Sequence, residues 1–233
     1  MKSAKLRKVD AHAKPGIDRV RLASGFFLLL IGIMLILQIP IVLLYYADLI
    51  SYNSLDFLST AMLSMSFSIS AFAYLMAFKK LSFKDSAREL GLGRKELTIS
   101  IIAIGIVLFL AIFALEGIVT AIESYFHITI STNVAEVMAG APMWFYIFVA
   151  IVAPINEEIL FRGLLVPRIG IVASAVVFAL LHYTYYSSYG IEVIAALVFG
   201  LLAGYVYKKT GSLYASTVAH VLVNIFAVIN LLA

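Results

Sequence analysis

Seven apolar stretches, most of them long enough to cross a lipid bilayer, make up the larger part of this 233-residue chain. A spanning helix needs about 20 mostly apolar residues, and in hydrocarbon its backbone must satisfy its own hydrogen bonds. The chain is 63% hydrophobic and 13% charged, where a soluble domain carries about 25% charged residues. The sequence therefore predicts an all-α, polytopic membrane bundle of about seven transmembrane helices. The predicted spans are 22–46, 57–78, 97–122, 142–165, 169–187, 191–207 and 213–232.

Every Lys and Arg falls on one side of this predicted topology. Seven of the 17 lie in the first 21 residues, six lie in the loop 79–96, and the loops 47–56 and 123–141 carry none. The positive-inside rule then predicts a multi-pass protein of the cell membrane with a cytoplasmic N-terminus and an extracytoplasmic C-terminus. We divide the chain into a basic tail (1–21), helices one to three (22–141) and a helical core (142–233). Within the loop 79–96 we expect a short amphipathic helix on the membrane surface.

Composition excludes several classes of function. The chain has no cysteine, which rules out disulfides, thiolate metal sites and a cysteine nucleophile. The basic tail lacks aromatic residues that could stack on bases, so we expect no nucleic-acid partner and interpret the tail as a cytoplasmic membrane anchor. No Gly-x-Ser-x-Gly elbow occurs, which disfavours serine hydrolase chemistry.

Charged side chains interrupt the fourth predicted span. Glu158 and Arg162 are four residues apart with the glutamate first, the favoured order for an ion pair on one helix face. Glu157 points about 100° away around the helix, so its carboxylate is free to act as a base. Pro154, one turn earlier, frees a backbone carbonyl and is expected to kink the helix beside a polar cavity. A plain intrahelical salt bridge remains the alternative for the Glu158–Arg162 pair.

Two histidines lie inside predicted spans, and both belong to the same half of the chain as the glutamates. His182 follows Phe178 by one helical turn in the fifth span, where Phe178 is expected to pack near the imidazole. His220 and Asn224 face the same way, four residues apart, in the seventh span. Hydrogen-bonded helix packing is the alternative reading for both histidines.

Together these residue types suit the hydrolysis of an amide bond. A carboxylate can deprotonate water, a neutral imidazole can hold that water, and a second imidazole with an amide can donate to a developing oxyanion. The rival is a zinc metalloprotease with Zn²⁺ at Glu157, His182 and His220, although no His-Glu-x-x-His motif is present. We therefore expect no cofactor, with zinc as the alternative.

The order of these motifs resembles the CaaX-protease and bacteriocin-processing (CPBP, or Abi) family of intramembrane proteases, which is related to the CaaX prenyl endopeptidase. The resemblance rests on "NEEILFRGLL", on "FALLH" and on His220-x-x-x-Asn224, and it covers residues 142–233. It implies a helical bundle around a cavity open to the cytosol, with Glu157 as general base, His182 binding the attacking water, and His220 and Asn224 forming the oxyanion site. Glu158, Arg162 and Phe178 are then supporting residues.

The resemblance also implies the substrate class, a membrane-associated and possibly prenylated CaaX-type protein. A non-enzymatic membrane scaffold or bacteriocin-immunity protein is the alternative function, and a transporter is disfavoured because polar residues crowd one half of the chain. The predicted depths of Glu157 and His182 in the membrane differ, which opposes a shared site. Counted at 1.5 Å per residue from the predicted turn after residue 165, Glu157 lies about 10 Å and His182 about 20 Å into the membrane.

Overall fold

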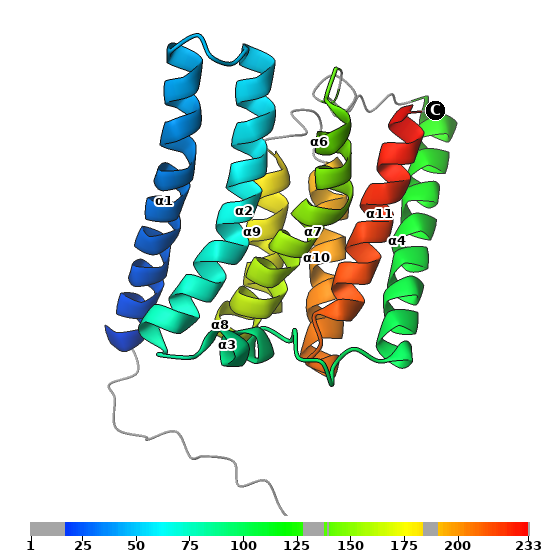
Figure 1. The fold of residues 1–233 in the computed structure, drawn as a ribbon. Coiled ribbons are helices and arrows are strands. Elements are labelled where there is room, and N and C mark those ends of the chain that lie inside the picture. Colours follow the sequence, from blue (N-terminus) through cyan, green and yellow to red (C-terminus); the bar gives the residue numbers. More distant parts are fainter. Residues whose placement is uncertain (1–16, 128–137, 139, 184–190, 233) are drawn as a thin grey trace, which may run out of the picture.

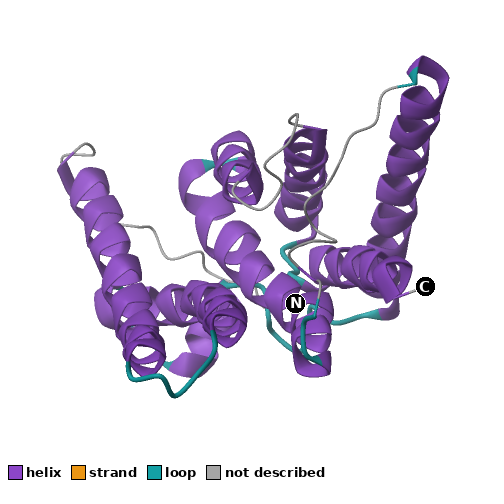
Figure 2. Ribbon diagram, turned by 90° about the horizontal axis from the view of Figure 1, so that it is seen from above, coloured by secondary structure: helices purple, strands orange, loops and turns teal. Residues whose placement is uncertain are grey.

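The computed structural model describes residues 17–127, 138, 140–183 and 191–232, and every regular element in these ranges is a helix (Figure 1). The view from above shows helices and loops alone in this part of the chain (Figure 2). The helices before the core are α1 (Ile17–Tyr46), α2 (Tyr52–Phe78), α3 (Phe83–Glu89) and α4 (Ile99–Phe126). The core contains α6 (Met143–Ile147), η1 (Phe148–Val152), α7 (Ala153–Glu158), η2 (Ile159–Leu165), α8 (Val166–Ile169), α9 (Ile171–Tyr183), α10 (Ile191–Thr210) and α11 (Tyr214–Leu232).

Six helical segments of the described chain are long and apolar enough to cross a membrane, which confirms the predicted polytopic helical bundle. They are Ser24–Tyr46, Tyr52–Phe78, Ile99–Phe126, Met143–Ile169, Val193–Thr210 and Tyr214–Leu232. The fifth predicted span corresponds to α9, whose apolar part, Ile171–His182, is shorter than the other six. The end of that predicted span (184–187) and the first 16 residues of the basic tail lie outside the described residues.

The fourth span is longer than the sequence pattern predicts. Its expected end at residue 165 is wrong, because the helix continues through Pro167 to Ile169 and ends at Gly170, which takes a left-handed φ of 87°. Counted from this end, Glu157 and His182 lie about 18 Å and about 17 Å along their helices, at 1.5 Å per residue. The predicted difference in depth therefore disappears.

Two π-helical segments, η1 and η2, flank α7. In each of them one backbone carbonyl accepts a hydrogen bond from a side chain of another helix. Asn224 Nδ2 donates to the Val149 carbonyl at 2.9 Å, and Ser174 Oγ donates to the Phe161 carbonyl at 2.8 Å. Pro154 is the second residue of α7 and contributes no N–H to the helix. Such π-turns occur often at functional sites because they change the direction of successive side chains. Here they surround the two glutamates.

Small residues let the core helices approach closely. A Cβ on Gly200 would lie 2.9 Å from the Ala175 Cβ, and a Cβ on Gly204 would lie 2.9 Å from Ile171 Cγ2. These two glycines therefore set α10 against α9. Helix α4 packs on α11 in the same way, since a Cβ on Gly105 would come within 2.6 Å of the Ala215 carbonyl oxygen. Without a hydrophobic drive between helices in lipid, such close contacts supply much of the association.

The short helix expected in the loop 79–96 is present as α3, and it lies at the end of the bundle where α1 begins (Figure 1). Ser82 caps its start, since its Oγ accepts from the Asp85 N–H at 3.1 Å. The end of α11 lies at the opposite end of the molecule (Figure 1). This agrees with termini on opposite sides of the membrane, while the assignment of the cytoplasmic side stays a prediction.

Glu89 joins three elements at this end of the bundle. Its Oε1 lies 2.7 Å from Lys79 Nζ, after α2, and 3.2 Å from Arg168 in α8. The hydrogen bond from Lys79, helped by the charges of Lys79 and Arg168, lowers the pKa of Glu89. All three side chains are partly exposed, so the network contributes little to stability at neutral pH.

We expect Glu89→Gln to remove a small, pH-dependent part of the stability. The pKa of Glu89 is lower in the folded chain than the unfolded value of about 4.3, so its contribution is complete above that value and is lost as the pH falls through the folded pKa. At pH 7 the variant should melt about 1–2 °C below the unmodified protein, and the difference should vanish at pH 3. Thermal unfolding in detergent at both pH values measures this. An equal difference at both would contradict the ionic explanation.

Candidate active site

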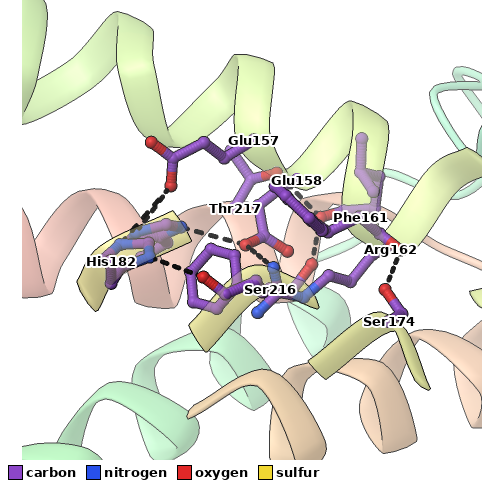
Figure 3. Close-up of polar contacts among 11 residues, drawn as sticks. Glu157, Glu158, Phe161, Arg162, Ser174, His182, Ser216 and Thr217 are labelled. Atoms are coloured by element: carbon purple, nitrogen blue, oxygen red, sulfur yellow. Dashed lines mark hydrogen bonds and ion pairs between the residues drawn. The ribbon is translucent and has the colours of Figure 1, made fainter. Parts of the chain in front are cut away.

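Three polar groups from three helices meet in the bundle. Glu157 Oε2, on α7, lies 4.0 Å from His182 Nε2 on α9 and 3.8 Å from His220 Nε2 on α11. The close-up shows Glu157 pointing toward His182, while Glu158 points toward Ser216 (Figure 3). The structure therefore brings together the predicted base and both predicted histidines, at a spacing that one bridging water can span.

Glu158 and Arg162 form the predicted ion pair, and both are buried. Arg162 Nη1 lies 3.0 Å from Glu158 Oε1, and the two side chains are 1% and 0% exposed. Glu157, in contrast, is 18% exposed, and the partners described for its carboxylate are the two imidazoles. The adjacent glutamates therefore have different surroundings. One is compensated by arginine, and the other faces the histidines.

The same Glu158 oxygen also contacts His220, a contact that the sequence patterns did not predict. His220 Nδ1 lies 2.9 Å from Glu158 Oε1, across 62 positions of sequence. Glu158 is therefore shared between Arg162 on its own helix and His220 on α11. No local spacing rule relates residues this far apart, so only the packing of α11 against α7 reveals the pair.

These contacts define which nitrogen of each imidazole carries the proton. His182 Nδ1 lies 2.9 Å from the Phe178 carbonyl, which can only accept, so this nitrogen donates. His220 Nδ1 likewise donates to the Glu158 carboxylate. In the neutral imidazoles both Nε2 atoms are then acceptors, and they face a third acceptor, Glu157 Oε2. An arrangement of three acceptors is satisfied by a water molecule that donates, by a proton or by a cation.

Two aromatic rings support the charged groups. The Arg162 guanidinium carbon lies 4.3 Å from the centre of the Phe178 ring and 5.1 Å from that of Phe199. Phe178 also contacts His182, with ring centres 4.3 Å apart, so the predicted packing of Phe178 on the imidazole is present. The sequence patterns did not predict Phe199, on α10, as a residue of the site, because nothing distinguishes one phenylalanine from the others in an apolar span.

Asn224 lies one turn after His220 on α11, and its described hydrogen bond goes to the Val149 carbonyl rather than to a site residue. One amide N–H is therefore engaged in joining α11 to η1. The predicted oxyanion role requires the second N–H and stays a prediction. Asn156 has a comparable joining role, since it is buried and donates to Ser64 Oγ on α2 at 3.2 Å.

The donor types of Glu157, His182 and His220 suit zinc, and the two separations measured from Glu157 Oε2 are longer than those between ligands of a bound zinc. Atoms bound to a tetrahedral zinc with bonds of about 2.1 Å lie about 3.4 Å apart. The separations of 3.8 and 4.0 Å from Glu157 Oε2 exceed this. Within the described residues no group of three or more His, Asp or Glu side chains has the arrangement of a metal site.

Comparison with known proteins shows that the site lies in a segment that matches a protein-family model. Residues 139–226 match the family model described as type II CAAX prenyl endopeptidase Rce1-like, and they include both glutamates, both histidines and Asn224. The uncharacterized protein YpbD of Bacillus subtilis (strain 168) is 34% identical over 78 residues, which are 34% of this chain and 41% of YpbD. The chain thus matches about two fifths of that relative's length. No solved structure matches the chain. The family resemblance inferred from the three motifs is confirmed for this segment.

Proposed function

We propose that this chain, whose residues 139–226 match the Rce1-like family, is a glutamate-type intramembrane endopeptidase. Its substrate would be a membrane-associated peptide or protein, possibly of the prenylated CaaX type. The observation that supports this most directly is the position of Glu157 Oε2, at 3.8 and 4.0 Å from two imidazole nitrogens that accept rather than donate. A carboxylate and two acceptors around one point suit the binding and deprotonation of a single water.

In the proposed reaction Glu157 takes a proton from a water molecule whose other hydrogen is held by His182 Nε2. The water oxygen then bonds to the carbonyl carbon of the scissile peptide, and the carbonyl oxygen becomes an oxyanion. Collapse of this intermediate breaks the C–N bond. The proton held by Glu157 passes to the departing amine, which balances the reaction as hydrolysis without a covalent enzyme intermediate.

His220 and Asn224 are proposed to stabilise the oxyanion. Neutral His220 presents an acceptor at Nε2, so it can donate there only as an imidazolium, which takes its proton from solvent before the peptide binds and keeps it throughout the reaction. Glu158 supports that state, because a buried carboxylate at Nδ1 orients an imidazole and stabilises the imidazolium. Asn224 would contribute the amide N–H that does not bond Val149. A buried Glu158 thus serves the reaction through His220 as well as the fold through Arg162.

The membrane location sets how a substrate would reach the site. Six apolar helices within the described part of the chain are long enough to span a membrane, as expected for a multi-pass membrane protein. Glu157 lies about 18 Å along its helix from the end that carries α3. We propose that this end is cytoplasmic, that the C-terminus is extracytoplasmic, and that a substrate anchored in the cytoplasmic leaflet enters from this side. A scaffold or immunity protein would keep the same polar core but would release no product.

Purified protein in liposomes, mixed with a library of membrane-anchored peptides, tests the proposed activity. The library should include pairs that differ only in prenylation of a cysteine near the C-terminus, with products identified by mass spectrometry. We expect new peptide termini with the unmodified protein and none with a His182→Gln variant that melts at the same temperature. Equal product with both proteins, or no product from any peptide, would contradict the proposal and favour a scaffold.

We expect chelators to leave this activity unchanged. The spacing of the site exceeds that of a zinc centre, and the proposed reaction uses only side chains and water. The measurement is the cleavage rate before and after dialysis against a zinc chelator, together with elemental analysis of the purified protein. Loss of activity along with stoichiometric zinc, and its return when zinc is added, would support the metalloprotease alternative instead.

A further inference from the structure

Phe199 is a buried aromatic residue of α10 that contacts both groups held by Glu158. Its ring centre lies 4.8 Å from that of His220 and 5.1 Å from the guanidinium carbon of Arg162. The side chain is 6% exposed and belongs to the main apolar core. It comes from a helix that carries none of the motif residues, so its contacts with the site result from the packing of α10 against α9 and η2.

The Arg162 guanidinium is held by its ion pair with Glu158 and by contacts with two aromatic rings. None of its nitrogens makes a hydrogen bond within the described part of the chain, although Nη1 is at ion-pair distance from Glu158. Phe178 and Phe199, with ring centres 6.1 Å apart, form adjoining walls beside the guanidinium. A cation held against an aromatic face is attracted to it, and more so where water is excluded.

His220 needs a comparable restraint. A single hydrogen bond through Nδ1 fixes one edge of the imidazole but leaves the ring free to tilt about that edge. Two rings limit this tilt and keep Nε2 directed at Glu157: Phe199, with ring centres 4.8 Å apart at 55°, and Phe178, with ring centres 5.8 Å apart at 78°. Phe199 makes the closer contact with the imidazole. Phe199 thereby contacts both side chains that share the same oxygen of Glu158, Arg162 through an ion pair and His220 through a hydrogen bond.

We propose that Phe199 is a positioning residue of the site, which holds Arg162 and His220 together on Glu158 and so aims His220 at Glu157. This inference rests on the proposed endopeptidase function for its kinetic effect, but its geometric part does not depend on catalysis. It names a residue outside the three sequence motifs.

The test compares Phe199→Leu with Phe26→Leu, a matched control. Phe26 is also 6% exposed and belongs to the same apolar core. Its ring contacts Phe27 and Tyr74, which are not residues of the site. We expect Phe199→Leu to lower kcat about five- to tenfold with KM changed less than twofold, since the loss of a buried cation–π contact corresponds to about that factor. Phe26→Leu should lower the melting temperature by a similar amount and leave kcat unchanged.

Two further measurements separate positioning from folding and from the proposed function. Incorporation of 3,5-difluorophenylalanine at position 199 keeps the shape of the ring and weakens the negative charge on its face. The kcat of this protein should lie below that of the unmodified protein and above the value expected for Phe199→Leu. This measurement remains possible if Phe199→Leu itself misfolds. Nitrogen NMR of histidine-labelled protein, assigned with His220→Gln, should show altered His220 signals in Phe199→Leu and unaltered ones in Phe26→Leu. Unchanged His220 signals would overturn the inference, whether or not the protein cleaves peptides. Absence of cleavage by the unmodified protein would overturn the proposed function alone.

Discussion

Glu157→Gln is expected to lower the cleavage rate by about 10³-fold or more while leaving the melting temperature within about 2 °C of the unmodified protein. An amide cannot take the proton from water, and general-base catalysis contributes about 10²–10⁴-fold. Glutamine has nearly the same shape, and Glu157 has no buried arginine of its own to leave uncompensated, since Arg162 pairs with Glu158. The measurements are kcat in liposomes and thermal unfolding in detergent.

Glu116→Gln is the matched control for this prediction. Glu116 is an exposed acid of α4, in a different membrane helix, and the same substitution there should change neither kcat nor the melting temperature measurably. A Glu157→Gln protein that still cleaves within tenfold of the normal rate would show that the attacking water is activated by another group. A scaffold function that survives Glu157→Gln intact would point to the alternative class.

Glu158→Ala is expected to destabilise the protein severely. It leaves the Arg162 charge buried at 1% exposure without its anion, and removal of one partner of a buried ion pair costs about 3–5 kcal/mol. For a chain of this size such a loss corresponds to a fall of about 10 °C or more in melting temperature. Activity should be lost as well, because His220 Nδ1 also loses its acceptor. Thermal unfolding in detergent and the cleavage assay measure the two effects separately.

A double variant distinguishes the two roles of Glu158. Glu158→Leu combined with Arg162→Met removes both buried charges, and apolar replacement of a buried pair is often neutral for stability. We expect this protein to be more stable than Glu158→Ala and still inactive, because His220 remains without its acceptor. If Glu158→Ala instead folds normally and it alone among the two glutamate variants abolishes cleavage, the roles of Glu157 and Glu158 are reversed.

The sequence alone determines the features that depend on neighbours within one helix or on solvent. The hydrophobic runs predict the membrane bundle because a spanning helix needs about 20 mostly apolar residues. The spacing of Glu158 and Arg162 predicts their ion pair, since residues four apart lie on one helix face. The three motifs in order predict the resemblance to CaaX-type intramembrane proteases, and residues 139–226 match the Rce1-like family model.

The position of helix ends and the contacts between distant helices were decided only by tertiary structure. The fourth span ends at Ile169 rather than at residue 165, and this difference of one turn brings Glu157 and His182 to the same depth. An apolar run does not show where its helix turns back, because the residues on both sides of the turn are equally suited to lipid. The contact between Glu158 and His220 and the position of Phe199 likewise depend on how α10 and α11 pack against the core. That packing is set by small residues such as Gly200 and Gly105, whose partners lie on other helices and leave no periodic signal in the chain.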